Sequence, residues 1–211
     1  MNSLNGVMVV GLTGQTGAGK STITEVFKKS GFAVIDADKV ARYVQRKGSP
    51  CLKELRDFFG REIISQDGTL DRKALAKKVF TEKSNLEALN SICYPYISNE
   101  ILCRIREYAD MQKKIILIDA PTLFESRADD FCELIISVIA KENLRMQRIM
   151  KRDGITEKAA RERMEAQHSQ DFFINNSDFI IKNDSTAENL NLVAAEVAEK
   201  ILDYYKRYYN G

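Results

Sequence analysis

The sequence predicts an α/β protein: a core with a five-stranded parallel sheet flanked by helices, plus an inserted helical region. Three observations carry this prediction. Short apolar runs alternate with helical segments, as in a parallel sheet buried on both faces. A glycine-rich loop joins the first run to the first helix. The segment between the second and third runs is too long for one crossover helix, so it predicts an inserted helical region.

Composition limits the class of protein. The chain has 211 residues, of which 44% are apolar and 29% charged, the balance of a globular enzyme. A net charge of +2 does not indicate a strongly basic nucleic-acid binder. With a single histidine and no C-x-x-C pair, a zinc site is not expected, and free thiols, buried or half-buried, are predicted at Cys51, Cys93, Cys103 and Cys132. Residues 1–5 do not begin a signal peptide and no apolar run reaches the ~20 residues of a membrane span, so we expect a cytoplasmic protein.

The elements are expected in alternation. Strands are predicted at residues 7–12, 32–35, 113–119, 134–140 and 178–181. The first helix should run from Lys20 to Ser30 and the last from about Thr186 to Tyr209. In the inserted region, Asp71 is a plausible N-cap for a helix over 72–81, and Pro95 marks a further boundary. The tyrosine-rich end of the last helix indicates helix packing, with partner or nucleic-acid binding as the alternative.

The loop G-x-x-x-x-G-K-S fits the P-loop pattern and lies between a strand and a helix, where that pattern is expected. Its glycines let backbone N–H groups surround phosphate oxygens, and the helix start adds a positive dipole end. Lys20 should reach the β- and γ-phosphates, and Ser21 should ligate Mg²⁺. The loop therefore predicts a purine triphosphate with Mg²⁺. The string nearest to the N-K-x-D guanine reader of GTPases, residues 181–184, has the wrong order, so we expect ATP. ATP would contact Gly14, Gln15, Thr16, Gly17, Ala18, Gly19, Lys20, Ser21 and Thr22.

A second group of residues is expected on the acceptor side. Asp36 and Asp38 follow the second strand, and ligands bind beyond the carboxyl ends of such strands. One of the two carboxylates could cap the next helix, since Asp is a favoured N-cap. We assign the catalytic base to Asp38, which would accept the proton of a substrate hydroxyl, and a structural part to Asp36.

Several strings, in this order, resemble the dephospho-CoA kinase family: "GLTGQTGAGKST", "VIDADKVAR", "GTLDRKALAKKVF", "IDAPTLFE", "RIMKRDGIT" and "IIKND". The resemblance spans about residues 7–190. It implies transfer of the ATP γ-phosphoryl group to the ribose 3′-hydroxyl of dephospho-CoA, the last step of coenzyme A synthesis. The small-molecule partners would be ATP and dephospho-CoA, with no nucleic acid or membrane, and a monomer is favoured.

The resemblance also implies roles for individual residues. Dephospho-CoA would be bound by Thr13, Asp38, Arg42, Arg72, Leu123, Phe124 and Glu125. Asp119 is placed like a Walker-B carboxylate that holds Mg²⁺; capping of a neighbouring loop is the alternative. Asn183 would lie near the adenine of ATP, or else be a turn residue. The chain departs from the family pattern at Thr122, Tyr94 and Arg145.

Arg145, Arg148 and Arg152 share one face of a predicted helix. Such a face is either solvated or part of a lid that closes over the phosphates, where guanidinium groups suit the charge of phosphoryl transfer. We assign Arg148 as catalytic and Arg152 as ATP-binding, with Gly154 as a lid hinge and Thr156 as a cap of the next helix.

The domains follow from these assignments. Residues 1–38, 113–141 and 175–211 would form the nucleotide-binding core, 39–112 the helical CoA-binding domain and 142–174 the lid. Three alternatives remain: another small-molecule kinase, a nucleotide-binding regulatory protein without turnover, and a nucleic-acid binder that uses the basic tail.

Overall fold

The computed structural model describes residues 6–79 and 81–209. Residues 1–5, for which we predicted no signal peptide, lie outside the described part, as do residues 80 and 210–211. The chain forms two compact units. We call them the core unit (Met1–Ile35 and Tyr108–Gly211) and the helical unit (Asp36–Glu107). The segment 142–174, expected to be a lid, belongs to the core unit.

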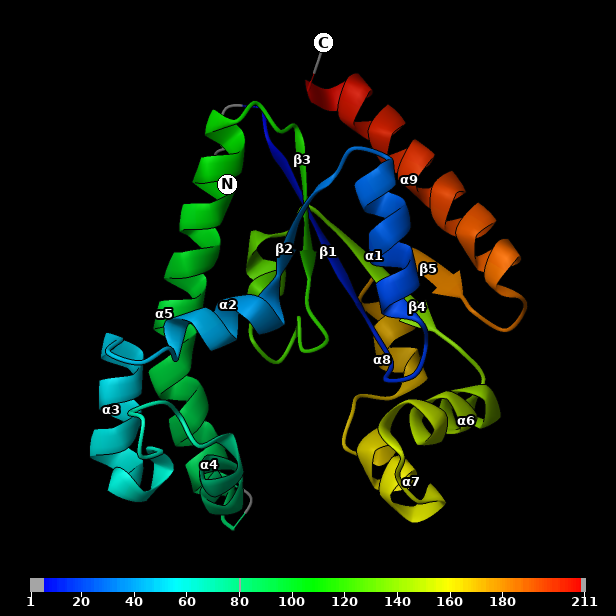
Figure 1. Ribbon diagram of the computed structural model, residues 1–211. Helices are drawn as coiled ribbons and strands as arrows, with labels where there is room; N and C mark the ends of the chain where they lie inside the picture. Colours follow the sequence, from blue (N-terminus) through cyan, green and yellow to red (C-terminus); the bar gives the residue numbers. More distant parts are fainter. Residues whose placement is uncertain (1–5, 80, 210–211) are drawn as a thin grey trace. The chain divides into compact units, whose positions relative to one another are not determined.

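A five-stranded sheet organises the chain, in the order β2-β3-β1-β4-β5 (Figure 1). The strands are β1 (Met8–Gly14), β2 (Ala33–Asp36), β3 (Ile115–Asp119), β4 (Leu134–Ile139) and β5 (Phe179–Lys182). β1 pairs in parallel with β3 and β4, and β4 pairs in parallel with β5. The predicted α/β sheet is therefore confirmed. The register pairs Leu12 with Asp119, so the loop after β1 and the end of β3 meet at one edge.

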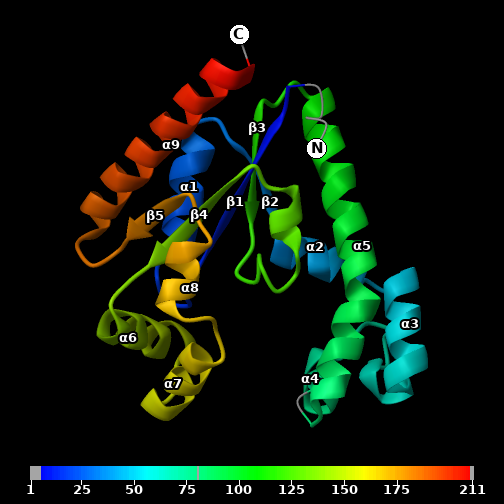
Figure 2. The same cartoon turned by 180° about the vertical axis from the view of Figure 1, so that it is seen from behind.

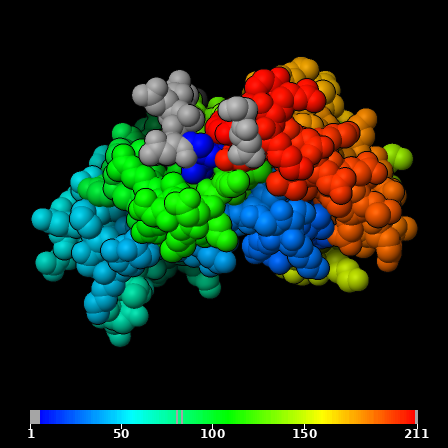
Figure 3. All heavy atoms as spheres, turned by 90° about the horizontal axis from the view of Figure 1, so that it is seen from above, coloured from blue at the N-terminus to red at the C-terminus, as the bar shows by residue number. Residues whose placement is uncertain are grey.

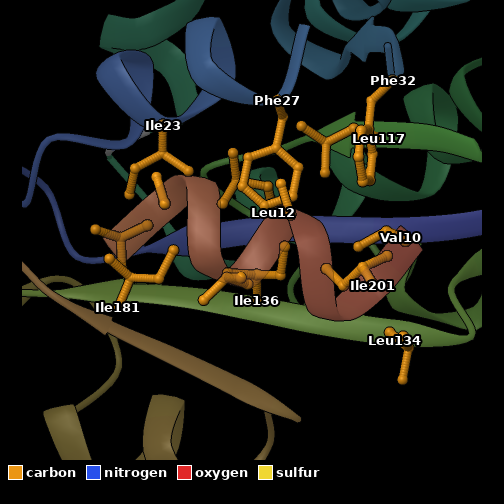
Figure 4. Packing of buried hydrophobic residues seen from close by; sticks show 14 of the residues in the cluster. Val10, Leu12, Ile23, Phe27, Phe32, Leu117, Leu134, Ile136, Ile181 and Ile201 are labelled. Atoms are coloured by element: carbon orange, nitrogen blue, oxygen red, sulfur yellow. The ribbon is translucent and has the colours of Figure 1, made fainter. Parts of the chain in front are cut away.

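One face of the sheet is covered by α1 (Lys20–Lys29) and α9 (Ala187–Tyr209). The two helices lie side by side, as Figure 3 shows in blue and in orange to red. Alternate residues of β1 project onto this face, where they join one apolar cluster with both helices (Figure 4). Labelled members of the cluster include Val10, Leu12, Ile23, Phe27, Ile136, Ile181 and Ile201. This packing holds the strand before the glycine-rich loop and the helix after it in fixed positions.

The C-terminal end of α9 packs against other parts of the core unit. Tyr205 is buried in the apolar cluster and donates a hydrogen bond from its hydroxyl to Gly6 O at 2.5 Å. Tyr209 stacks on Tyr205 and donates to the carboxylate of Glu133. Tyr208 is 64% exposed. These contacts support the packing interpretation of the tyrosine-rich end.

The other helices of the core unit follow β4. They are α6 (Glu142–Asp153), α7 (Glu157–Glu165) and α8 (Gln170–Asn175). α8 packs against β4, on the side of the sheet seen in Figure 2. Thr156 caps α7 as predicted, by accepting a hydrogen bond from Ala159 N at 3.3 Å. Gly154 ends α6 in the left-handed conformation, with φ 64°. A short 3₁₀ turn, η2 (Ala128–Phe131), precedes β4.

The helical unit consists of α2 (Ala37–Val44), α3 (Pro50–Phe59), the 3₁₀ turn η1 (Arg61–Ile63), α4 (Arg72–Val79) and most of α5 (Lys83–Asp110). Asp71 accepts hydrogen bonds from Lys73 N and Ala74 N, both at 3.0 Å, so the predicted cap of α4 is confirmed. The predicted boundary at Pro95 is wrong, because Pro95 lies inside α5. Proline removes one helical hydrogen bond, and here more than two turns on each side carry the helix past that loss.

No helix within residues 6–79 and 81–209 combines the length and the apolar character that a bilayer crossing requires.

Candidate active site

The glycine-rich loop connects β1 to α1, the context that the sequence predicted. Gly14 ends β1, and a Cβ there would lie 2.2 Å from Val138 O. Gly19 caps α1 in the left-handed region, with φ 99°, and a Cβ there would lie 2.4 Å from Asn183 Nδ2. Both positions therefore require glycine. The loop thus ends at the positive end of the α1 dipole, an arrangement suited to phosphate binding.

Three successive carbonyl groups of the loop each accept a hydrogen bond from a side chain outside it. The pairs are Thr16 O with Arg145 Nε (3.0 Å), Gly17 O with Arg148 Nη1 (3.4 Å) and Ala18 O with Asn183 Nδ2 (2.7 Å). Two of the donors lie on α6, and the third follows β5. The loop is therefore held from one side along its length.

Arg148 and Asn183 also bind each other. Both Nη atoms of Arg148 lie 3.2 Å from Asn183 O, and Nη2 lies 3.3 Å from Asn183 Oδ1. The Asn183 amide is 6% exposed, with its nitrogen donating to the loop and its oxygen accepting from Arg148. The sequence placed Arg148 at the transferring phosphoryl group and Asn183 beside adenine. Here both side chains contact the backbone around the loop.

Arg145 and Arg152, which the sequence placed on one helix face with Arg148, differ in exposure and in their partners. Arg145 is 6% exposed, and burial lowers the pKa of its guanidinium, while Glu142 acts in the opposite direction. Arg152 is exposed and binds the carboxylate of Asp153 with 2.7 and 2.8 Å contacts. That hydrogen bond raises the pKa of Arg152. The predicted stripe of arginines therefore contains one buried residue that contacts the loop and one residue paired at the surface.

Lys20 and Asp119 form an ion pair at the edge of the sheet. Their side chains are 18% and 14% exposed. The other oxygen of Asp119 accepts a hydrogen bond from Thr24 Oγ1 at 2.6 Å. The register of β1 and β3 brings this carboxylate to the first turns of α1. The two residues predicted for phosphate and metal binding are therefore neighbours.

The donors for a metal ion are oxygen atoms. Ser21 lies in the first turn of α1 with its side chain exposed, and Asp119 supplies a carboxylate nearby in the same unit. Within the described residues, no cluster of three His, Cys, Asp or Glu side chains forms a cage. Mg²⁺ in such sites takes one or two protein oxygens together with phosphate oxygens and water, so this donor set fits a metal that arrives with a nucleotide.

The segment that follows α7 contacts the glycine-rich loop at Thr16. Gln167 Oε1 accepts a hydrogen bond from Thr16 N at 2.6 Å. Gln15 is 6% exposed, and its Oε1 atom has no hydrogen-bond partner among the described residues. Gln15, Arg145, Gln167 and His168 all line one pocket of about 440 Å³. This pocket lies beside the glycine-rich loop, within the core unit.

Three core-unit residues that the sequence predicted to contact dephospho-CoA are in contact with other residues of the chain. Thr13 is buried and donates a hydrogen bond to Pro121 O at 3.3 Å. Phe124 packs edge-on against Phe172 at 5.1 Å between ring centroids. Glu125 Oε1 lies 3.7 Å from the Nε2 atom of His168.

Leu123 is buried in the core unit. The sequence placed it among the dephospho-CoA contacts, yet it has no exposed surface. Its side chain fills the space beside Gly11, where an added Cβ would lie 2.7 Å from Leu123 Cδ2. Leu123 therefore packs against β1 at Gly11.

In the helical unit, Asp36 and Asp38 lie at the junction of β2 and α2 and have separate roles. Asp36 is the N-cap of α2 and accepts a hydrogen bond from Lys39 N at 2.9 Å. The structural part predicted for Asp36 is therefore confirmed. Asp38 is exposed in the first turn of α2, and Arg42 is exposed in the last turn. Asp38 is thus not used as the cap and remains accessible to a ligand.

Arg72 lies close to a second cationic group. Burial lowers the pKa of Arg72, and the charge of Arg42 lowers it further. Arg72 Nη1 donates to Gln45 Oε1 at 2.9 Å, and Gln45 Nε2 lies 3.4 Å from Cys93 Sγ. Two guanidinium groups that repel each other form a favourable place for an anion.

The predicted free thiols are confirmed: Cys51 and Cys93 are buried, with their sulfur atoms 3.8 Å apart, and Cys103 and Cys132 are partly buried.

Sequence reasoning missed several residues that contact the loop or its lysine. Thr24 lies one helical turn after Lys20, and this i, i+4 spacing could have placed the two on one face. The sequence placed Arg145 on a helix face with Arg148 and Arg152 and noted it as a departure from the family pattern, but it did not predict the contact of Arg145 with Thr16. Gln167 carries no local signal, because its contact with Thr16 depends on how residues 142–174 fold back onto the loop.

Comparison with known proteins tests the resemblance. The model of the dephospho-CoA kinase family matches residues 8–189. The chain belongs to the dephospho-CoA kinase family. A dephospho-CoA kinase of Corynebacterium glutamicum is 36% identical over 193 residues, covering 92% of this chain and 96% of the relative. A dephospho-CoA kinase of Arabidopsis thaliana is 37% identical over 199 residues, covering 94% of this chain and 84% of the relative.

Solved structures agree with this family assignment. Dephospho-CoA kinase from Campylobacter jejuni is 27% identical, with a TM-score of 0.69, and the match covers 92% of this chain and 96% of that one. The protein TT1252 from Thermus thermophilus is 26% identical with a TM-score of 0.77, and the match covers 92% and 97% of the two chains. A shikimate kinase from Bacteroides thetaiotaomicron, at 12% identity and a TM-score of 0.54, shares the fold.

Proposed function

We propose that this chain transfers the γ-phosphoryl group of ATP to the ribose 3′-hydroxyl of dephospho-CoA and so completes coenzyme A. The observation that carries the proposal is the family match over residues 8–189. The glycine-rich loop, the lysine that follows it and the accessible Asp38 support the proposal, because they would supply the phosphate binding and the general base that this reaction needs.

The nucleotide would bind at the loop. The N–H groups of the loop and the start of α1 would hold the phosphates, and Lys20 would exchange its carboxylate partner Asp119 for phosphate oxygens. Ser21 and Asp119 would hold Mg²⁺, which supplies charge neutralisation and orientation of the phosphates. Release of Asp119 from Lys20 would free that carboxylate at the moment the nucleotide enters.

The acceptor would be activated by Asp38. A carboxylate exposed in the first turn of α2 can accept the proton of a hydroxyl and hold its oxygen toward the γ-phosphorus. Arg42 and Arg72, close enough that one lowers the pKa of the other, would receive the negatively charged phosphates of dephospho-CoA. Thr13, Phe124 and Glu125 would contribute contacts from the core unit.

Two arginines of the lid segment would act on the phosphates. To reach the transferring phosphoryl group, Arg148 would turn one edge of its guanidinium away from Asn183. Arg152 would leave its partner Asp153 to bind the phosphates. Both are guanidinium groups on α6, which can follow the charge as it spreads over the equatorial oxygens. We also propose that the enzyme acts in the cytoplasm, where free thiols such as those of Cys51 and Cys93 persist.

The test is an acceptor screen. Purified protein is given Mg·ATP with dephospho-CoA, with pantetheine phosphate, with shikimate or with no acceptor, and ADP release is followed. Release that depends on dephospho-CoA supports the proposal. Release with another acceptor would assign a different small-molecule kinase. Binding of ATP without release in any arm would indicate a regulatory protein.

A further inference from the structure

We propose that hydrogen bonds from Arg145, Arg148 and Asn183 shape the glycine-rich loop for phosphate before the nucleotide arrives. We call these three residues the carbonyl clamp. The proposal rests on the proposed function in one respect, that the loop binds the phosphates of ATP, and it is independent of the acceptor.

The first step of the argument is geometric. Each clamp residue donates a hydrogen bond to one of three successive carbonyls, at Thr16, Gly17 and Ala18. In a trans peptide the C=O and the following N–H point in opposite directions. Holding the Thr16 and Ala18 carbonyls toward α6 and Asn183 therefore turns the N–H groups of Gly17 and Gly19 to the opposite side of the loop, while the N–H of Ala18 donates to Gln15 O at 3.0 Å. N–H groups gathered on one side form the concavity that binds anions.

The second step concerns entropy. The loop carries glycines at three positions with positive φ: Gly14, Gly17 and Gly19. Such a backbone has many accessible conformations, and fixing each residue costs about 1–2 kcal/mol. Where the protein fixes the loop through side chains, the nucleotide does not have to order it on binding. Pre-organisation of this kind raises affinity without adding a contact to the ligand.

The third step concerns Arg145, whose contact with the loop can be tested separately from any direct contact with the phosphates. Arg145 is 6% exposed and donates from Nε to Thr16 O at 3.0 Å. A Cβ on Gly17 would lie 2.8 Å from Arg145 O, so the α6 backbone itself touches the loop. A buried guanidinium packed in this way acts through the loop rather than on the phosphates. Arg145 is therefore a positioning residue, although the sequence placed it on the same helix face as the lid arginines.

The fourth step is a second hydrogen bond to the backbone of Thr16. Gln167 accepts from Thr16 N at 2.6 Å, while Arg145 donates to Thr16 O. The backbone of Thr16 is thus bound on both sides by the segment 142–174. These two contacts fix the orientation of the Thr16 backbone from outside the loop, in addition to the hydrogen bond from Ala18 N to Gln15 O within it.

The test uses Arg145→Met, which keeps most of the apolar stem and removes the donors. Arg161→Met is the matched control, because Arg161 lies in the same segment, is half exposed and pairs only with Glu142 and Glu157 in the described residues. ADP binding is measured by calorimetry without any acceptor. Loss of one charged hydrogen bond that shapes the site predicts a roughly tenfold weaker affinity for Arg145→Met. Arg161→Met should stay within about twofold of the unmodified protein.

Hydrogen exchange separates positioning from general loss of structure. In Arg145→Met without nucleotide, exchange over residues 14–20 should be faster than in the parent, while exchange over β3 and β4 is unchanged. Saturating ADP should restore protection of the loop. Parent-like affinity together with parent-like loop exchange would overturn the proposal, as would weaker binding accompanied by faster exchange throughout the core unit.

A second variant keeps the test valid if Arg145→Met folds poorly. Asn183→Asp retains the size of the side chain but replaces the donor to Ala18 O with an oxygen. It should also weaken ADP binding and speed exchange of the loop, and normal values for both would overturn the clamp. None of these readouts involves dephospho-CoA, so failure of the clamp and failure of the proposed acceptor can be told apart.

Discussion

Replacing Gly19 with alanine tests the contact between the loop and Asn183 directly. Gly19 has φ 99°, and an added Cβ would lie 2.4 Å from Asn183 Nδ2. Gly31 is a matched control, because its φ is 94° and an added Cβ there meets nothing within 4 Å. Both substitutions carry the cost of a left-handed backbone, roughly 1–2 kcal/mol. Only Gly19→Ala must also displace the Asn183 amide.

The extra cost can be worked out from the contact that is lost. Displacing Asn183 breaks its 2.7 Å hydrogen bond to Ala18 O. This bond is buried, because Asn183 is only 6% exposed. A buried polar group left without its partner costs about 1–3 kcal/mol. Gly19→Ala should therefore lower the free energy of unfolding by about 2 kcal/mol more than Gly31→Ala does.

The assay is urea unfolding without nucleotide, followed by far-UV circular dichroism because the chain has no tryptophan. The same pair of substitutions is then made in Asn183→Ala, where the nearest remaining atom to the new Cβ is Leu190 Cδ2 at 3.6 Å, an ordinary contact. There the two alanines should cost the same. Equal losses in the parent, or an unequal loss that persists in Asn183→Ala, would refute the contact.

Three further predictions concern the site and the lid segment. Asp38→Asn should leave ATP affinity unchanged and lower kcat by ~100-fold or more, as loss of a general base does; near-normal kcat would remove Asp38 from that role. Lys20→Ala should weaken ATP binding and lower kcat together, and normal values for both would contradict the assignment of the loop. Asp153 has a lowered pKa because of its hydrogen bonds and ion pairs with Arg152 and Arg163. Its contribution to stability is therefore present above the unfolded pKa and lost as the pH falls through the folded one. The difference in Tm between the parent and Asp153→Asn should shrink from pH 6 to pH 3, and a constant difference would contradict the pairing.

The fold was largely predictable because its signals are local. Apolar runs, the glycine-rich loop and caps such as Asp71 depend on neighbouring residues, and the structure confirms them. Pro95 shows where local reasoning fails. A proline lowers the stability of one turn, and the sequence does not show that a helix of 28 residues continues through it.

The candidate site divides in the same way. The loop, Lys20 and Asp119 could be found from a motif and a strand end, and parallel register then places them together. The partners of the loop could not be found, because Arg145 and Gln167 reach it from more than a hundred residues away. A periodic row of arginines indicates one helix face, but it does not tell which arginine that face buries.

The measurement that tests the central claim most directly determines which atom receives the γ-phosphoryl group of ATP. Purified protein is incubated with Mg·ATP and dephospho-CoA, ADP release is followed, and the product is examined by ³¹P NMR. The account predicts ADP release that requires dephospho-CoA and a new phosphomonoester on the ribose 3′-oxygen. ATP binding without stimulated release, or a phosphate at another position, would contradict it.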